Sequence, residues 1–222
     1  MVEMLVGVAI GLIVVACALR VLIQTRNTTD LLQDRVELHQ RAEIIFYNMA
    51  HQISHASTAN GGRETSGLNN LPPRLSLHYD APPDGDAFNC LGWRPHATLT
   101  NPHPTINSEY FLSSNARLMC TDAAAHNTQT IASGVRALDV EFLIETPHPD
   151  GSGWRYVKAP ELGPAAGAVR AVAVCLHLFS ERRYRTEANP VQRDCQNTAP
   201  LPDDGYLHQV FRRTFAMRNS KP

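Results

Sequence analysis

The chain has 222 residues, a formal net charge of -1 and 18% charged residues. A near-neutral balance is not typical of general nucleic-acid-binding proteins, which carry a basic face or stripe, so we do not expect nucleic acid as a partner. The chain contains no internal repeat and no long low-complexity tract, which argues against solenoids and propellers.

The chain opens with an apolar run, MVEMLVGVAIGLIVV, that holds a single carboxylate, Glu3. Residues 4–19 carry no charge and are apolar on all sides of a helix, which favours a bilayer or fully buried packing. Such a helix is about 24 Å long, and the three apolar residues after Arg20 lengthen it toward the ~30 Å hydrocarbon core if the guanidinium reaches the interface. We therefore expect residues 1–24 to form a helix that lies in the lipid bilayer.

The small residues at the end of this segment also match two kinds of processing site. Ala16-Cys17-Ala18 resembles the end of a cleaved signal peptide, and Val14-Val15-Ala16-Cys17 resembles a lipoprotein box with Cys17 as the lipidated residue. Both need a basic n-region, whereas this one holds Glu3 and neither Lys nor Arg. A signal-anchored or lipid-anchored periplasmic binding domain is therefore an alternative of lower rank.

The helical pattern continues over residues 25–57 as an amphipathic helix. No Pro or Gly occurs between Asn27 and Asn60, and Gly61-Gly62 is the expected stop. Apolar residues recur at spacings near three and four along one face, and charged residues fall mostly on the other. The apolar stripe consists of Leu31, Leu38, Ala42, Ile45, Met49 and Ile53, and the solvated side of Asp30, Asp34, Arg35, Glu37, Arg41 and Glu43.

Residues 58–222 are punctuated by prolines and contain short strand patterns, so we expect them to form a β-rich head domain. Val140, Phe142 and Ile144 alternate with other residues as one buried strand face would, and the continuous apolar run 171–176 is typical of a central strand. Strands that follow one long helix predict an α+β fold with an antiparallel sheet. The candidates are Arg74–His78, Glu109–Ser113, Ala116–Cys120, Leu138–Glu145, Arg155–Lys158, Val169–Phe179 and Val210–Arg218.

Four cysteines lie in the polar part of the chain: Cys90, Cys120, Cys175 and Cys195. They form no close doublet of the kind that zinc sites use, so disulfides in an oxidising compartment are the better interpretation, with buried free thiols as the alternative. Four cysteines allow three connectivities. We favour Cys90–Cys120 with Cys175–Cys195 because each bond closes a short loop.

No pattern in the sequence predicts an enzyme, a metal site or a cofactor. His51 and His55 have the spacing of zincin ligands, but Gln52 stands where such a site needs a glutamate base, so we expect two helix-surface histidines. The basic clusters 181–185 and 212–213 are better explained as a charged loop and a protected strand edge than as a phosphate site. The turn 148–153 offers calcium one carboxylate only, which makes a hairpin the better interpretation.

Two parts of the chain together resemble a known family. The N-terminal Met1–Val6, with Gly7, Ala9 and Gly11 in an apolar run before an amphipathic helix, resembles type IV pilins. The segments 133–142 and 211–219 resemble the PilW-type minor pilins, and Cys90 and Cys120, on either side of Tyr110-Phe111-Leu112, fit the usual cysteine pair of that family. Met1 lies about two residues inside the mature pilin start, so the basic leader, its cleavage glycine and the methylated first residue of that family are missing from this sequence. Three explanations stay open: a start codon further upstream, a trimmed sequence, or a copy that is not processed.

The resemblance implies a type IV pilin-like fold and a minor subunit of the type IV pilus that takes part in assembly. Such a subunit sits in the bacterial inner membrane with its head in the periplasm and then enters the filament, with roles in twitching motility and adhesion. Its implied partners are other minor and major pilins and the inner-membrane assembly platform. A pseudopilin of a type II secretion system is the nearest alternative, and gene neighbourhood would separate the two.

Within this family pattern Glu3 is the assembly or docking residue. A carboxylate at membrane depth is costly and usually functional. The resemblance supplies its partner, the N-terminal amine of a neighbouring subunit. A position among lipid headgroups at the helix N-terminus, where the helix dipole favours an acid, is the alternative. Leu5, Val8, Leu12 and Val15 represent the apolar surface that the bilayer or filament core would cover.

Overall fold

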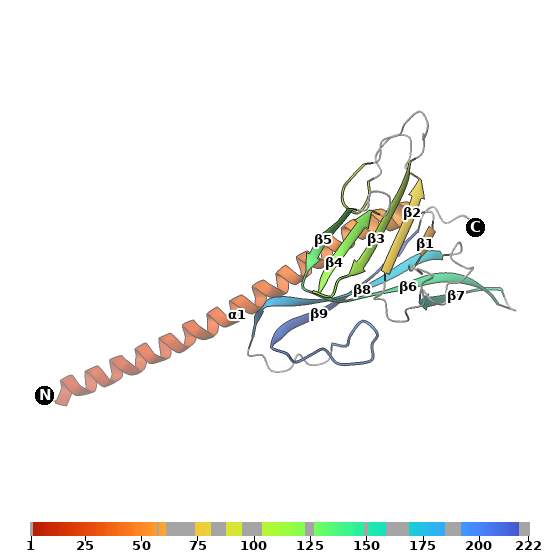
Figure 1. The fold of residues 1–222 in the computed structure, drawn as a ribbon. Coiled ribbons are helices and arrows are strands. Elements are labelled where there is room, and N and C mark those ends of the chain that lie inside the picture. Colours follow the sequence, from red (N-terminus) through yellow and green to blue (C-terminus); the bar gives the residue numbers. More distant parts are fainter. Residues whose placement is uncertain are drawn as a thin grey trace.

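A computed structural model describes one long helix and nine strands among the residues that it places. Helix α1 (Val2–His55) projects far beyond the strands, and its C-terminal half lies against them (Figure 1). This arrangement confirms the expected α+β fold with a long N-terminal helix on antiparallel strands. The described residues are 2–56, 58–60, 74–80, 88–94, 104–122, 127–148, 151–158, 169–184 and 192–217.

Helix α1 is continuous through both of its halves, as the absence of Pro and the helix-forming composition predict. Its last residue is His55, and the amide of Ala56 donates to the carbonyl oxygen of Gln52 at 3.1 Å as the chain leaves the helix. The helix thus ends before Gly61-Gly62, the expected stop, which lies outside the described residues.

The first sheet has five antiparallel strands in the order β1-β2-β3-β4-β5. Strands β2, β3 and β4 alternate buried and more exposed residues, as a sheet with one covered face requires. Strands β1 and β5 were not expected from the sequence, and β5 is largely exposed. Their bounds are β1 Thr58–Asn60, β2 Arg74–Asp80, β3 Thr105–Leu112, β4 Arg117–Asp122 and β5 Asn127–Ser133.

The second sheet has four antiparallel strands in the order β7-β6-β8-β9. Strand β8 is internal, as its continuous apolar run predicts, and Val140, Phe142 and Ile144 of β6 are at most 5% exposed. His148 faces Gly151 in the register of β6 and β7, which confirms the hairpin predicted for this turn. The bounds are β6 Val135–His148, β7 Gly151–Lys158, β8 Val169–Arg183 and β9 Tyr206–Ala216.

One hydrophobic core joins both sheets to the C-terminal half of α1. Leu38, Ile45, Met49 and Ile53 of the predicted helix stripe are at most 2% exposed, and each contributes about 1.5–3 kcal/mol by leaving water. The prediction for the solvated side was wrong at Asp34, which is 6% exposed. Periodicity alone could not reveal this burial, because it depends on the end of β8 covering the helix at that point.

Candidate assembly surface and the head that carries it

The N-terminal half of α1 is an uncovered apolar surface. Leu5, Val8, Leu12 and Val15 are 70%, 63%, 65% and 56% exposed. Within the described part of the chain, α1 is the helix whose length and composition suffice to cross a membrane, and its apolar stretch contacts no part of the head. A contiguous apolar surface of this extent marks a site for protein or membrane contact, because its exposure to water is unfavourable in free energy.

Glu3 lies in the first turn of α1, at the free end of this surface. Its side chain is exposed, and the first cation that follows it in the sequence is Arg20, about 25 Å further along the helix axis. None of the labelled strands lies near the first turns of α1 in Figure 1. The docking role of Glu3 therefore stays a prediction, and any partner for its carboxylate must come from outside this chain's described residues.

The C-terminal half of α1 is fixed to the second sheet by ion pairs as well as by the core. Arg213 of β9 donates two hydrogen bonds to the Glu43 carboxylate, at 2.6 and 3.0 Å, while its guanidinium lies 5.1 Å from the centre of the Phe46 ring. Arg41 binds Glu37 within the helix and Glu181 of β8 at 2.9 Å. These contacts set the direction in which α1 leaves the head.

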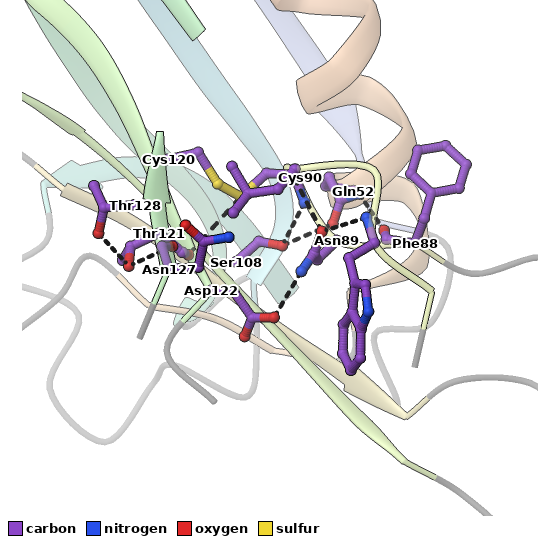
Figure 2. Close-up of a disulfide and its surroundings, with 12 residues drawn as sticks. Gln52, Phe88, Asn89, Cys90, Ser108, Cys120, Thr121, Asp122, Asn127 and Thr128 are labelled. Carbon is purple, nitrogen blue, oxygen red and sulfur yellow. Dashed lines mark hydrogen bonds between the residues drawn. A yellow bond between two sulfur atoms is a disulfide. The ribbon is translucent and has the colours of Figure 1, made fainter. Parts of the chain in front are cut away.

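Gln52 is the polar link between α1 and the first sheet, and sequence reasoning missed it. It is fully buried, its side-chain amide donates to the Phe88 carbonyl oxygen at 2.5 Å, and its oxygen accepts from the hydroxyls of Tyr79 (3.2 Å) and Ser108 (3.1 Å). Figure 2 shows Gln52 beside Phe88 and Ser108, close to a disulfide. The sequence did hold a sign of this burial: Gln52 lies three residues after Met49 and therefore on the apolar face of the helix.

The neighbouring histidines behave differently from Gln52. His51 is half-buried with its ring stacked 4.2 Å from Phe88, and burial, followed by the charge of His55, lowers the His51 pKa. His55 is exposed, as expected for a helix-surface histidine. Among the described residues no group of three His, Cys, Asp or Glu side chains could hold a metal ion.

Both expected disulfides are present in the structure. Cys90–Cys120 has a Cα–Cα distance of 6.2 Å and Cys175–Cys195 one of 5.6 Å, both within the usual range for a disulfide. The first joins the segment 88–94 to β4, and the second joins the segment 192–200 to β8. Cys17 is a free, exposed cysteine on the apolar half of α1. The disulfides therefore hold irregular segments onto the sheets.

The segment next to the first disulfide is a tight, hydrogen-bonded turn centred on Asn89. Its side-chain oxygen accepts from the amides of Leu91 (3.0 Å) and Trp93 (2.9 Å), and its amide group donates to Asp122 at 2.7 Å. Gly92 occupies the left-handed region with φ 78°. The turn leaves the Trp93 side chain 52% exposed on a rigid support.

A chain of polar contacts runs from two buried histidines, His177 of β8 and His208 of β9, to the exposed Asp204 and Arg136. The rings of His177 and His208 are hydrogen-bonded at 3.0 Å, His208 binds Asp204 at 2.7 Å, and Asp204 pairs with Arg136 at 3.1 Å. Burial, and then the neighbouring His208 and Arg136, lower the pKa of His177 to about 4. His177 is therefore neutral at neutral pH, and the chain acts as a structural link between strands.

The comparisons with known proteins found a matching family and a structural neighbour. The family model described as Type IV Pilus-assembly protein W (PilW) matches residues 107–219, slightly more than half of the chain. A solved structure of a type IV-like pilin from Thermus thermophilus aligns with 83% of this chain and 98% of its own, at 10% sequence identity and a TM-score of 0.48. No curated protein matches.

Proposed function

Because this chain belongs to the PilW family of type IV pilus-assembly proteins, we propose that it is a minor pilin that helps to initiate the pilus and then enters the filament near its tip. The observation that carries the proposal is the long helix whose N-terminal half is apolar, uncovered and rigidly joined to a folded head. In this role the protein works by assembly and not by catalysis, and it supports pilus biogenesis, twitching motility and adhesion.

The apolar half of α1 serves two environments in turn. It lies in the inner membrane while the head stands in the periplasm, and it then moves into the core of the filament among the helices of other pilins. Both environments exclude water, so the transfer exchanges one apolar surrounding for another and requires no large free energy. The inner-membrane assembly platform is the partner that would carry out this transfer.

The amphipathic half of α1 also offers apolar side chains to neighbouring subunits. Leu32, Val36, Ile44 and Tyr47 point away from the head and are 54%, 55%, 67% and 78% exposed. Their spacing places them along one side of the helix. A head-to-tail contact that uses this side, repeated by one rotation and rise, generates a helical filament.

Glu3 then acts as the docking group at the growing end. In a dry filament core its carboxylate needs a cation, and the N-terminal amine of a neighbouring pilin has the right charge. We expect Glu3→Ala to insert into membranes normally, because removal of the acid makes the segment more apolar. Co-purification with other minor pilins should fall sharply. Undiminished co-purification would remove Glu3 from the mechanism.

The proposal is tested by placing a charge in the middle of the apolar surface. Leu12→Asp changes the insertion free energy by about 3–4 kcal/mol at a helix centre, a factor of a few hundred. We expect the variant head to fold but the subunit to be absent from sheared pili on immunoblots. Leu12→Val, which keeps the surface apolar, is the matched control. Normal incorporation of Leu12→Asp would contradict a filament-core role.

A further inference from the structure

A cavity of about 470 Å³ lies where α1 leaves the head. One wall is the stretch of α1 from Gln24 to Leu31, and the other is the end of β8 with Arg182, Arg183 and Tyr184. Figure 1 shows β8 beside α1 on the side of the head from which the helix projects. The Tyr184 hydroxyl donates to the Asp30 carbonyl oxygen at 3.2 Å, which fixes the end of the strand to the helix.

If α1 spans a bilayer, the length of its apolar segment determines how far this cavity lies from the hydrocarbon core. From Val2 to Ile23 the helix is about 33 Å long, which matches a hydrocarbon core of ~30 Å. The wall from Gln24 to Leu31 adds about 12 Å, and each polar headgroup layer is roughly 5–8 Å thick. When α1 spans the membrane, the end of β8 therefore lies in or immediately above the headgroup layer.

Exposed arginines of α1 and of the end of β8 lie at or just below this height, and the acidic Glu181 beside them is paired with Arg41 at 2.9 Å. Arg20 and Arg26 of α1 are exposed, and Asp30 is the acidic residue of α1 between Met4 and Gln33. The ion pair between Arg182 and Asp30 is long, at 3.7 Å, and both side chains are more than half exposed, so it neutralises Arg182 weakly.

The second arginine of the strand end is also presented to solvent. The Arg183 guanidinium lies 5.0 Å from the centre of the Tyr206 ring and is fully exposed. Asp204, the carboxylate that acts on Arg183 from the neighbouring loop, is itself held by Arg136 and His208. Asp203 of the same loop is exposed and offsets part of the charge.

We propose that Arg20, Arg26, Arg182 and Arg183 form a basal arginine surface that binds the phosphate groups of anionic phospholipids. Guanidinium groups donate paired hydrogen bonds to phosphate oxygens, and each basic residue near an anionic membrane surface strengthens attachment about fivefold. The surface holds the head upright on the leaflet from which it projects until the subunit enters the filament. This inference rests on the membrane-spanning role proposed for α1.

The test uses the full chain reconstituted into two kinds of vesicle, phosphatidylcholine alone and phosphatidylcholine mixed with phosphatidylglycerol. Flotation first shows whether the chain inserts. Hydrogen–deuterium exchange then reports on the amides from Glu181 to Tyr184. We expect these amides to exchange about tenfold more slowly in the anionic vesicles, and the difference to vanish at about 1 M salt, where the Debye length is ~3 Å.

Three variants isolate the arginines. Arg182→Gln with Arg183→Gln should abolish the slowing, whereas Arg182→Lys with Arg183→Lys should retain most of it because the charges remain. Arg155→Gln, an exposed arginine of β7, is the control and should behave as wild type. Near-ultraviolet circular dichroism of each variant shows that the head is folded.

The outcomes separate the two proposals. Flotation with both vesicle types but equal exchange in each overturns the basal arginine surface and leaves the membrane-spanning role intact. Slowing that persists in the double glutamine variant, or that inorganic phosphate reproduces with neutral vesicles, also overturns it. Failure to float with either vesicle type overturns the membrane-spanning role together with this inference.

Discussion

Gln52→Leu is the sharpest test of how the head is held on α1. The substitution keeps the size of the side chain but removes the amide donor to the Phe88 carbonyl and the oxygen that accepts from Tyr79 and Ser108. The Tyr79 hydroxyl retains the Phe88 carbonyl as an acceptor at 2.9 Å. The Ser108 hydroxyl accepts from the Cys90 amide at 3.0 Å and loses the acceptor that Gln52 supplies in the structure.

The magnitude follows from these contacts. Each lost hydrogen bond costs about 1 kcal/mol, and a buried hydroxyl without an acceptor costs about 1–3 kcal/mol. Some of this is offset because leucine is more apolar than glutamine, which leaves an expected loss of about 3 kcal/mol in the free energy of unfolding. The segment 88–94 should loosen as well, because its first carbonyl is held by Gln52.

The assay is urea unfolding of the full chain in detergent, followed by the fluorescence of Trp93 and Trp154. Gln33→Leu makes the same chemical change on the exposed face of α1 and should alter stability by less than about 0.5 kcal/mol. Gln52→Glu provides a pH test: burial raises a carboxyl pKa, and only the protonated acid can donate to the Phe88 carbonyl. Its deficit relative to wild type should therefore shrink as pH falls from 7 to 5.

A Gln52→Leu protein within about 1 kcal/mol of wild type would refute this reasoning. It would mean that the polar link makes no net contribution and that the apolar stripe alone attaches the helix. The same conclusion would follow if Gln52→Glu kept a constant deficit across that pH range.

Three further predictions concern the head. Gly134→Ala should cost about 2–4 kcal/mol, because φ is 71° and the added Cβ would lie 2.8 Å from the Phe179 carbonyl oxygen; Gly205→Ala, with 3.6 Å to its nearest atom, should lower the melting temperature less. His177, with its pKa lowered to about 4, should make wild-type stability fall as pH drops from 6.5 toward 4, since the unfolded chain binds the proton first; a His177→Leu profile with an unchanged slope would contradict this. Removal of the Cys175–Cys195 disulfide by two Ala substitutions should lower the free energy of unfolding by about 3 kcal/mol, measured in urea against the wild type without reductant.

The sequence predicted the features that local chemistry controls. The uncharged run 4–19 indicated a helix for a dry environment, and the stripe through Leu38, Ile45 and Met49 indicated which side of α1 the head would cover. Continuous apolar residues marked β8 as an internal strand. In each case the pattern follows from the repeat of one helix or strand, so it needs no knowledge of the neighbouring elements.

Strand β5 and the pairing of the two sheets could not be predicted in this way. The segment 127–133 is polar and largely exposed, so it lacks the alternation that burial imposes. It is a strand because β4 offers it a partner edge, with Asn127 opposite Asp122 and Ser133 opposite Arg117. The division of the strands into two sheets likewise depends on long-range pairing.

The sequence by itself thus determined the long helix and its apolar half with Glu3. It also determined the family to which the chain belongs, through the match over residues 107–219. Only the tertiary structure decided that Asp34 is covered, that Gln52 joins helix to sheet, and that the arginines at the end of β8 lie at the base of the head. Apolar patterns can be read from the sequence because buried positions recur with the period of each element, about 3.6 residues in a helix and 2 in a strand. A polar side chain is buried where partners from other segments satisfy it, and those partners come together only in the fold.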